Sequence, residues 1–108
     1  MKLLCECGQT ISDTTDRLPY KAYFIADQDL FDMWDTMDKI IADVADARKT
    51  TEEAERAHRM ASSFYRTMYQ CLKCGRLLVA DLQGNRSIYA PTSTEDSRNI
   101  LEGKNKTV

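Results

Sequence analysis

The chain has 108 residues, 43% of them hydrophobic and 30% charged, which predicts one soluble domain over residues 1–108 and excludes a disordered or fibrous protein. The formal net charge of −2 argues against nucleic-acid binding, which depends on excess positive charge. No apolar run approaches the roughly 18 residues of a membrane span and no secretory signal opens the chain, so we expect a cytoplasmic protein without membrane contacts.

The N-terminal segment predicts a cysteine knuckle between two short strands. Residues 2–4 favour a strand that runs into Cys5-Glu6-Cys7-Gly8, and residues 9–11 favour the returning strand. Gly8 allows the positive φ that turns backbone amides toward thiolate sulfurs. A polar loop follows over residues 12–17, and a further strand is predicted over residues 20–26.

An antiparallel helical hairpin is predicted over about residues 28–66. From residue 27 the apolar period changes to that of a helix, which we expect to end near Arg48 and Lys49 and to be capped by Asp27 or Asp29. A second helix is predicted to start at residue 50 or 51 and to end within residues 64–66, although residues 65, 67 and 69 also alternate as in a strand. Only a short connection lies between the two helices.

The C-terminal segment predicts a second knuckle over residues 71–75 and a β-hairpin over about residues 76–90. Its strands are expected over residues 77–82 and 86–90, with the turn at Gln83-Gly84-Asn85. A short last helix over residues 94–101, capped by Thr94, and a frayed tail over residues 104–108 complete the prediction.

The four cysteines predict a structural zinc site formed by Cys5, Cys7, Cys71 and Cys74. Two thiolates from each knuckle satisfy tetrahedral Zn²⁺, and the single residue between the first pair is tighter than the usual two. The cytosol disfavours structural disulfides, and a redox Cys-x-x-Cys pair would leave the other pair unexplained. An iron–sulfur cluster can use the same thiolates and stays an open alternative.

No catalytic constellation is visible, so we expect a protein that is not an enzyme. His58 is the only histidine, and it lies at the edge of the apolar face of the second predicted helix. No phosphate-binding glycine loop, nucleophile elbow or His-Glu-x-x-His motif occurs in the chain.

The first predicted helix carries an acidic face. Asp32, Asp35 and Asp43 lie opposite its apolar arc, and this face is either a solvated surface or a binding surface for a cationic protein. Phe31 lies among the aspartates as a candidate exposed anchor, whereas Met33, Trp34 and Met37 are predicted to pack in the core.

The pattern Cys-x-Cys-Gly followed by Tyr-x-Cys-x-x-Cys-Gly-Arg-Leu before a hairpin resembles the zinc-ribbon superfamily. The resemblance implies an α+β fold, a small antiparallel zinc-ribbon sheet with an inserted helical hairpin, and the four cysteines as ligands. In size, charge and architecture the chain also resembles small bacterial immunity proteins of secreted toxins, which implies a cationic toxin domain as partner. The alternative is a nucleic-acid- or ribosome-associated zinc ribbon that would use Lys73, Arg76 and Arg86.

Overall fold

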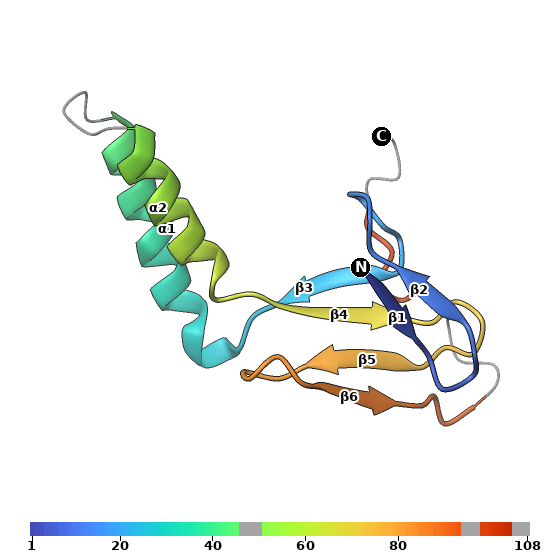
Figure 1. The fold of residues 1–108 in the computed structure, drawn as a ribbon. Helices are drawn as coiled ribbons and strands as arrows, with labels where there is room; N and C mark the ends of the chain where they lie inside the picture. Colours follow the sequence, from blue (N-terminus) through green and yellow to red (C-terminus); the bar gives the residue numbers. More distant parts are fainter. Residues whose placement is uncertain (46–50, 94–97, 105–108) are drawn as a thin grey trace. The chain divides into compact units, whose positions relative to one another are not determined.

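The computed structural model describes residues 1–45, 51–93 and 98–104, apart from the side chains of residues 43, 44, 51, 53, 54, 57, 58 and 61. The described residues form a mixed α+β fold with antiparallel sheets, which confirms the predicted class (Figure 1). Neither of the two α-helices in this part of the chain combines the length and apolar character needed to cross a membrane.

The chain divides into two compact units. The first, here called the sheet unit, combines Met1–Tyr23 with Thr67–Val108, and the second, the helical unit, comprises Phe24–Arg66. The sheet unit is therefore built from both ends of the chain, and the helical unit is the segment between them. That residues 1–108 fold as one domain stays a prediction.

A two-stranded sheet holds the N-terminal segment. Strand β1 (Lys2–Leu4) pairs antiparallel with β2 (Thr10–Ser12), and Leu3 lies opposite Ile11. The strands are joined by the turn that contains the first two cysteines. This register buries Ile11, whereas its neighbours on β2 are more exposed, as expected of a strand with one covered face.

A four-stranded sheet has the order β3-β4-β5-β6, with β3 at Lys21–Phe24, β4 at Arg66–Gln70, β5 at Leu77–Ala80 and β6 at Arg86–Tyr89. Strands β5 and β6 form a hairpin, whose turn residue Gly84 has φ of 85°. The Asp81 carboxylate accepts hydrogen bonds from the backbone amides of Gln83 and Asn85, which fixes this turn.

The core of the sheet unit brings together both ends of the chain. Cys5 and Ile11 from the N-terminal segment pack with Tyr69, Cys71 and Leu78 from the C-terminal segment. Burial of a side chain as large as that of Tyr69 or Leu78 contributes about 2 kcal/mol. The same cluster therefore stabilises the sheets and contains two of the predicted metal ligands.

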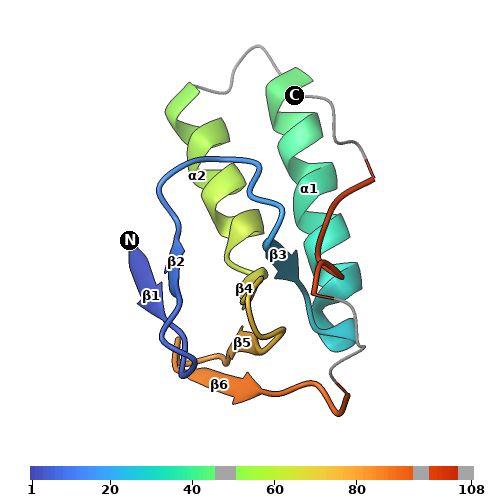
Figure 2. The ribbon, with the colours of Figure 1, turned by 90° about the vertical axis from the view of Figure 1, so that its right-hand side faces the viewer.

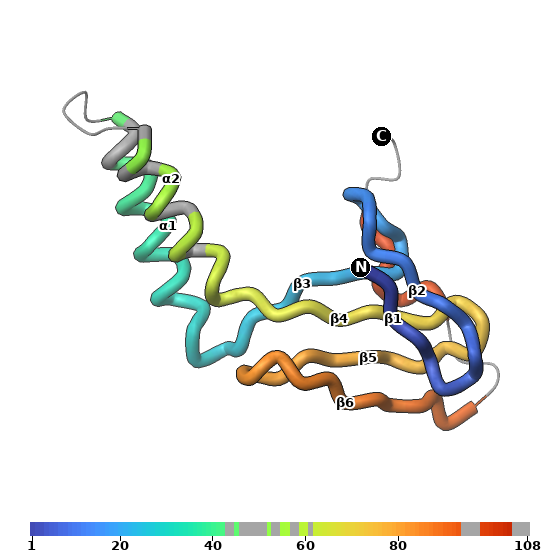
Figure 3. Tube along the Cα trace, viewed as in Figure 1, coloured from blue at the N-terminus to red at the C-terminus, as the bar shows by residue number. Residues whose placement is uncertain are grey.

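The helical unit begins with a 3₁₀ turn, η1 (Asp27–Asp29), and continues as α1 (Leu30–Ala45) and α2 (Thr51–Ser62). The two helices lie side by side and run in opposite directions, and their path can be followed in Figures 2 and 3. Ala26 occupies the N-cap of η1, and its side chain makes no capping hydrogen bond. The predicted cap of the α-helix by Asp27 or Asp29 stays a prediction. The predicted end near Arg48 and Lys49 lies outside the described residues.

Burial on α1 differs from the prediction. Met33 is buried as expected, but Trp34 and Met37 are exposed, and Phe31 is exposed as predicted. Helical periodicity shows which side chains share a face, and it does not show how wide a surface the neighbouring element covers. A single partner helix covers only a narrow strip of α1, so part of the apolar arc stays in contact with solvent.

Two predicted helix boundaries are wrong. Helix α2 ends at Ser62, earlier than residues 64–66, because Arg66 already belongs to β4 and the Ser62 hydroxyl donates to the Arg59 carbonyl at 2.8 Å. The described part of the predicted last helix, residues 98–101, is a bend and a turn instead. Its Ile100 N–H donates to the Gln70 side chain at 3.0 Å, a bond outside any helical pattern. Thr94, the predicted cap, lies outside the described residues.

Candidate metal centre

The first knuckle, residues 5–8, follows directly from β1. The Cys5 N–H donates to the Gln9 carbonyl, and the Gly8 N–H donates to the Cys5 carbonyl, both at 2.9 Å. Gly8 has φ of 94°, and a Cβ placed there would meet no atom within 4 Å. Glycine is thus needed at this position for its backbone conformation and not for lack of space. The turn brings the Cys5 and Cys7 sulfurs within 4.8 Å of the sulfurs of the second cysteine pair.

The second knuckle, residues 71–75, begins where β4 ends. The Gly75 N–H donates to the Cys71 carbonyl at 2.8 Å, and the Cys71 N–H donates to the Arg76 carbonyl at 2.9 Å. Gly75 has φ of 83°, so both knuckles close with a glycine in the left-handed region, as the sequence predicts. The neighbouring strands β4 and β5 thus flank a tight turn that two backbone hydrogen bonds close.

The four cysteine sulfurs converge on one point. All four Sγ atoms lie within 4.8 Å of one another, with Cys5 3.5 Å from Cys74 and Cys7 3.5 Å from Cys71. A tetrahedron with metal–sulfur bonds of about 2.3 Å has sulfur–sulfur edges of about 3.8 Å. All four thiols are free, and the separations are too long for disulfide bonds. The four cysteines can therefore coordinate a metal ion, as predicted.

Burial and hydrogen bonding divide the four thiols into different electrostatic environments. Cys5 and Cys71 are buried, whereas Cys7 and Cys74 are half-buried. Burial raises the pKa of Cys71 to about 12, although the backbone amides of Cys74 and Lys73 favour its thiolate. Burial also acts to raise the pKa of Cys74, but the Arg76 backbone amide and the other three thiols lower it to about 6. Cys74 accordingly loses its proton more readily than Cys71.

Arg76 contacts the candidate metal centre, a position that the sequence analysis missed. Its Nη1 donates to the Cys74 sulfur at 3.5 Å, and hydrogen bonding to that sulfur raises the pKa of the guanidinium. A cation beside a thiolate offsets the net negative charge of a four-thiolate site. The position two residues after a ligand cysteine is the signal that could have indicated this contact.

Gln70 is a second residue that the sequence analysis missed. It is buried directly before Cys71, and its side-chain nitrogen donates to the Gly75 carbonyl at 3.3 Å. Its side-chain oxygen accepts the Ile100 N–H at 3.0 Å. Gln70 therefore ties the second knuckle to the segment after β6. A polar residue at the end of a strand, directly before a predicted ligand, is the corresponding sequence signal.

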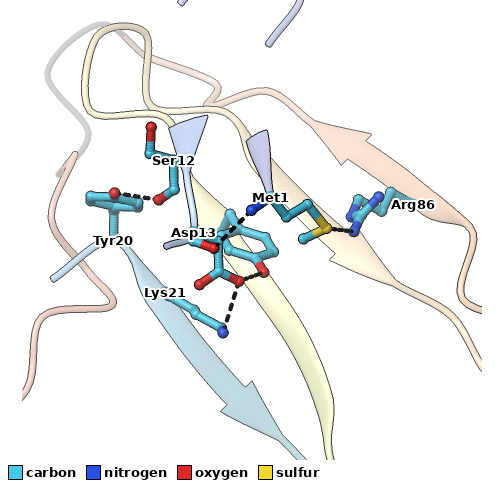
Figure 4. A network of polar contacts seen from close by, with 7 residues as sticks. Met1, Ser12, Asp13, Tyr20, Lys21 and Arg86 are labelled. Carbon is cyan, nitrogen blue, oxygen red and sulfur yellow. Dashed lines mark hydrogen bonds and ion pairs between the residues drawn. The ribbon is translucent and has the colours of Figure 1, made fainter. Parts of the chain in front are cut away.

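A polar network connects the first strands to β4 (Figure 4). The Asp13 carboxylate accepts a hydrogen bond from the Tyr69 hydroxyl and forms an ion pair with Lys21 at 2.9 Å. The Tyr69 hydrogen bond and Lys21 lower the pKa of Asp13. The Met1 amino group donates to the Asp13 carbonyl at 3.2 Å, and Tyr20 donates to the Ser12 carbonyl. The network thus fixes the N-terminal segment, which carries Cys5 and Cys7, against β4.

The predicted partner-binding residues lie in the helical unit, apart in sequence from the cysteines. Phe31, Asp32 and Asp35 are exposed on α1, and the Phe31 and Trp34 rings meet edge to face with centroids 5.4 Å apart. The side chains of Asp43 and His58 lie outside the described set. The structure brings together the four predicted metal ligands and places Phe31, Asp32 and Asp35 on one helix.

The cations of the alternative nucleic-acid prediction occupy separate environments in the sheet unit. Lys73 is exposed within the second knuckle, and Arg76 contacts the Cys74 sulfur. Arg86 lies on β6, where its Nη2 approaches the Met1 sulfur at 3.8 Å. Two of these three side chains thus have intramolecular contacts.

Comparison with protein-family models assigns the chain to a family. Residues 1–96 match the model of a domain of unknown function, DUF8617, and the chain belongs to this family. The match includes all four cysteines, both helices and all six strands. Comparisons with curated proteins and with solved structures gave no match.

Proposed function

We propose that Cys5, Cys7, Cys71 and Cys74 bind one structural Zn²⁺ ion and that the sheet unit is a split zinc ribbon with a helical hairpin inserted between its knuckles. The convergence of four sulfurs within 4.8 Å carries this proposal. Four thiolates fill a tetrahedral zinc site and leave no position for substrate, which is the arrangement of structural sites. The ion would join the two ends of the chain, so its binding contributes directly to folding.

The sulfur separations favour a single ion over an iron–sulfur cluster. A cluster holds its thiolates around several iron and sulfide atoms, so its ligands must lie further apart than those of one ion. Two of the sulfur pairs are 3.5 Å apart and all four sulfurs lie within 4.8 Å of one another, which suits a single ion. A lone iron ion offers the same geometry as zinc, and only metal analysis with visible absorption separates the two.

Metal analysis of the purified protein tests this site. We expect one zinc per chain and a colourless protein, because Zn²⁺ has a filled d shell. Replacement of Cys71 and Cys74 by Ser should abolish the bound metal. Lys73→Ser is the matched control, because it changes an exposed side chain between the two cysteines and keeps the backbone amide. A stable protein with four free thiols and no bound metal would refute the proposal.

We further propose that the chain is a cytoplasmic protein-interaction module of the immunity or antitoxin type, and not an enzyme. It would bind a cationic protein, such as a toxin domain, through Asp32, Asp35, Asp43 and Phe31. The observation that supports this function is the charge of α1, which carries four aspartates and a single lysine. Exposed carboxylates on a rigid helix attract a basic surface over a distance of about 10 Å and guide its approach.

The nucleic-acid alternative has weaker support. It requires a basic surface on the second knuckle and the hairpin, but Arg76 contacts the Cys74 sulfur and Arg86 lies beside Met1. With Arg76 beside the Cys74 sulfur, Lys73 and Arg86 alone would supply little charge to neutralise phosphates. An electrophoretic mobility assay with RNA and DNA over a salt series tests this alternative, and we expect no shift at physiological salt.

Copurification from the native host tests the interaction function. We expect the wild-type chain to retain a basic protein and a variant with Asp32, Asp35 and Asp43 changed to Asn to lose it. Proteins that bind the affinity resin nonspecifically will appear with both chains, so the comparison identifies them. Retention of every partner by both chains would contradict the proposed use of the acidic face.

A further inference from the structure

Four large apolar side chains of α1 are exposed to solvent. Phe31 is 70% exposed, Trp34 48%, Met37 42% and Ile41 66%. Exposed apolar residues are common when isolated, but contiguous groups usually mark a surface that another molecule covers. These four residues are called the apolar stripe below.

The spacing of the apolar stripe places its members on one side of the helix. They follow one another at intervals of three, three and four residues, so neighbouring members lie one turn apart. The edge-to-face contact of Phe31 with Trp34, at 5.4 Å, shows that the first two side chains meet. Met33, which is buried, lies one turn before Met37 on the adjoining part of the helix surface. The apolar stripe is therefore the exposed continuation of the apolar arc to which the buried Met33 belongs.

Carboxylates border and interrupt the apolar stripe. Asp35 lies one turn after Phe31, and Asp38 lies one turn after Trp34 and just before Ile41. Both aspartates are exposed. Lys39 is the one basic residue of α1. An occupant of this surface must therefore cover apolar side chains and place positive charge beside two carboxylates.

These charges discriminate between possible occupants. Pairing of the apolar stripe with that of a second copy would bring Asp35 and Asp38 of both chains to one interface, where like charges repel. Nucleic acids and anionic membranes would be repelled for the same reason. A basic amphipathic segment of another protein satisfies both requirements, since its apolar side covers the aromatic rings and its Lys or Arg residues reach the carboxylates.

We propose that the apolar stripe of α1 is the docking site for a basic amphipathic segment of a protein partner, anchored on Trp34 and flanked by Asp35 and Asp38. The inference rests on the proposed function and specifies how the cationic partner is bound. Apolar contact with Phe31, Trp34 and Ile41 supplies the affinity, and the carboxylates supply orientation and selectivity. Charge alone would not select an amphipathic segment over any other cation.

The single tryptophan of the chain reports occupancy of this surface. The probe is a synthetic helical peptide of about 18 residues, made of Leu and Lys with the leucines on one face. It contains no tryptophan, so any change in emission comes from Trp34. We expect a saturable blue shift that weakens as salt rises from about 50 to about 500 mM. A Leu/Glu peptide of the same pattern should give none.

Two variants separate the apolar stripe from the rest of the surface. Phe31→Ala combined with Ile41→Ala keeps Trp34 as the reporter and should weaken binding about tenfold or more. Met60→Ala removes an equally exposed side chain from α2 and should leave binding unchanged. Because all three side chains are exposed, circular dichroism should show the same helix content in each variant.

The outcomes distinguish this inference from the proposed function. If the Asp-to-Asn variant of residues 32, 35 and 43 loses its partner but the Phe31/Ile41 variant keeps full affinity, the proposed function stands and the docking site is wrong. Equal binding of a Lys/Leu peptide with scrambled order would also overturn it. So would sedimentation showing a dimer of the free chain that the Phe31/Ile41 variant converts to monomer, because a second copy would then cover the apolar stripe.

Discussion

The two units of the chain place their apolar side chains differently. In the sheet unit, Ile11, Tyr69 and Leu78 are buried together with two cysteines. In the described part of the helical unit, Met33 alone is buried, while the apolar stripe and Met60 are exposed. Both units are small, so the apolar area that each can bury is limited. Each therefore needs a further source of stability.

The difference in burial indicates that the two units are stabilised in different ways. The sheet unit uses four convergent thiols and a polar network, which hold two distant segments of the chain together. The helical unit leaves an apolar face available to another molecule. We therefore expect substitutions in the sheet unit to change stability and substitutions on the exposed face of α1 to change binding.

Metal removal should produce the largest effect. A strong chelator, or the Cys71→Ser/Cys74→Ser variant, should unfold the sheet unit, because structural zinc contributes on the order of 10 kcal/mol to folding. Thermal unfolding followed by circular dichroism, with and without chelator, measures the loss. The comparison between units would fail if the chelated protein melted at the same temperature as the untreated protein.

Tyr69→Phe should have the next largest effect, a loss of about 2 kcal/mol in the free energy of unfolding, because it removes a hydrogen bond to a charged carboxylate. The pKa of Asp13 is lowered in the folded state by Tyr69 and Lys21. Its ionised form thus stabilises the fold above about pH 4, and this contribution is lost as the pH falls through the folded pKa. The difference between wild type and variant should therefore shrink in acid.

Tyr20→Phe is the control for this pH dependence. The Tyr20 hydroxyl donates to the Ser12 backbone carbonyl, which does not titrate. Its removal should destabilise the protein by a similar or smaller amount that does not change between neutral and acidic pH. Urea unfolding at several pH values measures both variants, and equal pH dependence in the two would contradict the assigned role of Asp13.

The two knuckle glycines should each tolerate substitution poorly. Gly8→Ala and Gly75→Ala place a Cβ on a residue with positive φ, which costs about 1–2 kcal/mol. Gly103→Ala is the control, because a Cβ there would meet no atom within 4 Å and its φ is not in the left-handed region. Denaturant unfolding of the metal-loaded protein measures the three variants, and equal midpoints would show that the knuckles are less constrained than described.

Arg76→Gln should weaken metal binding without preventing it. Loss of the guanidinium beside the Cys74 sulfur removes a charge that favours the thiolate, and outer contacts of this kind change metal affinity by about tenfold or more. Competition with a chromophoric chelator measures the affinity. Lys73→Gln removes an exposed charge from the same knuckle and should have less effect. A larger loss for Lys73→Gln would show that general charge, and not the contact, is responsible.

The acidic face should have the smallest effect on stability. A variant with Asp32, Asp35 and Asp43 changed to Asn should unfold within about 1 kcal/mol of wild type, because exposed charges contribute little to folding. Its association with an identified cationic partner should be slower and less dependent on salt. Stopped-flow kinetics over a salt series measures this, and a wild-type rate throughout would leave α1 as a solvated surface only.

The convergence of the four cysteines was predictable because each knuckle is a local pattern. A pair of cysteines followed by glycine specifies its own turn within four or five residues, and the convergence of Cys5 with Cys74 follows from the demand of one ion for four ligands. The contact of Arg76 with the Cys74 sulfur was not predicted, because an arginine near a knuckle is consistent with several roles. Its contact with Cys74 depends on the path of the strand after Gly75.

Long-range contacts were not predictable from local patterns. Asp13 and Tyr69 are 56 positions apart, and no periodicity relates them. The exposure of Trp34 and Met37 was missed for a different reason, since a helical wheel gives the direction of a face and not the area that a neighbour covers. The end of α2 at Ser62 reflects a competition between helix and strand propensity that the Tyr65-to-Tyr69 alternation decides in favour of strand.

The division of the four cysteines between the two ends of the chain has a consequence for biosynthesis. Sixty-three residues separate Cys7 from Cys71, and the whole helical unit lies within that interval. While the ribosome synthesises the chain, α1 and α2 can pair through contacts that are close in sequence, but Cys5 and Cys7 must wait for residue 74 before four ligands exist. Pulse-labelled nascent chains stalled before and after residue 74 should therefore differ in thiol reactivity at the same two cysteines.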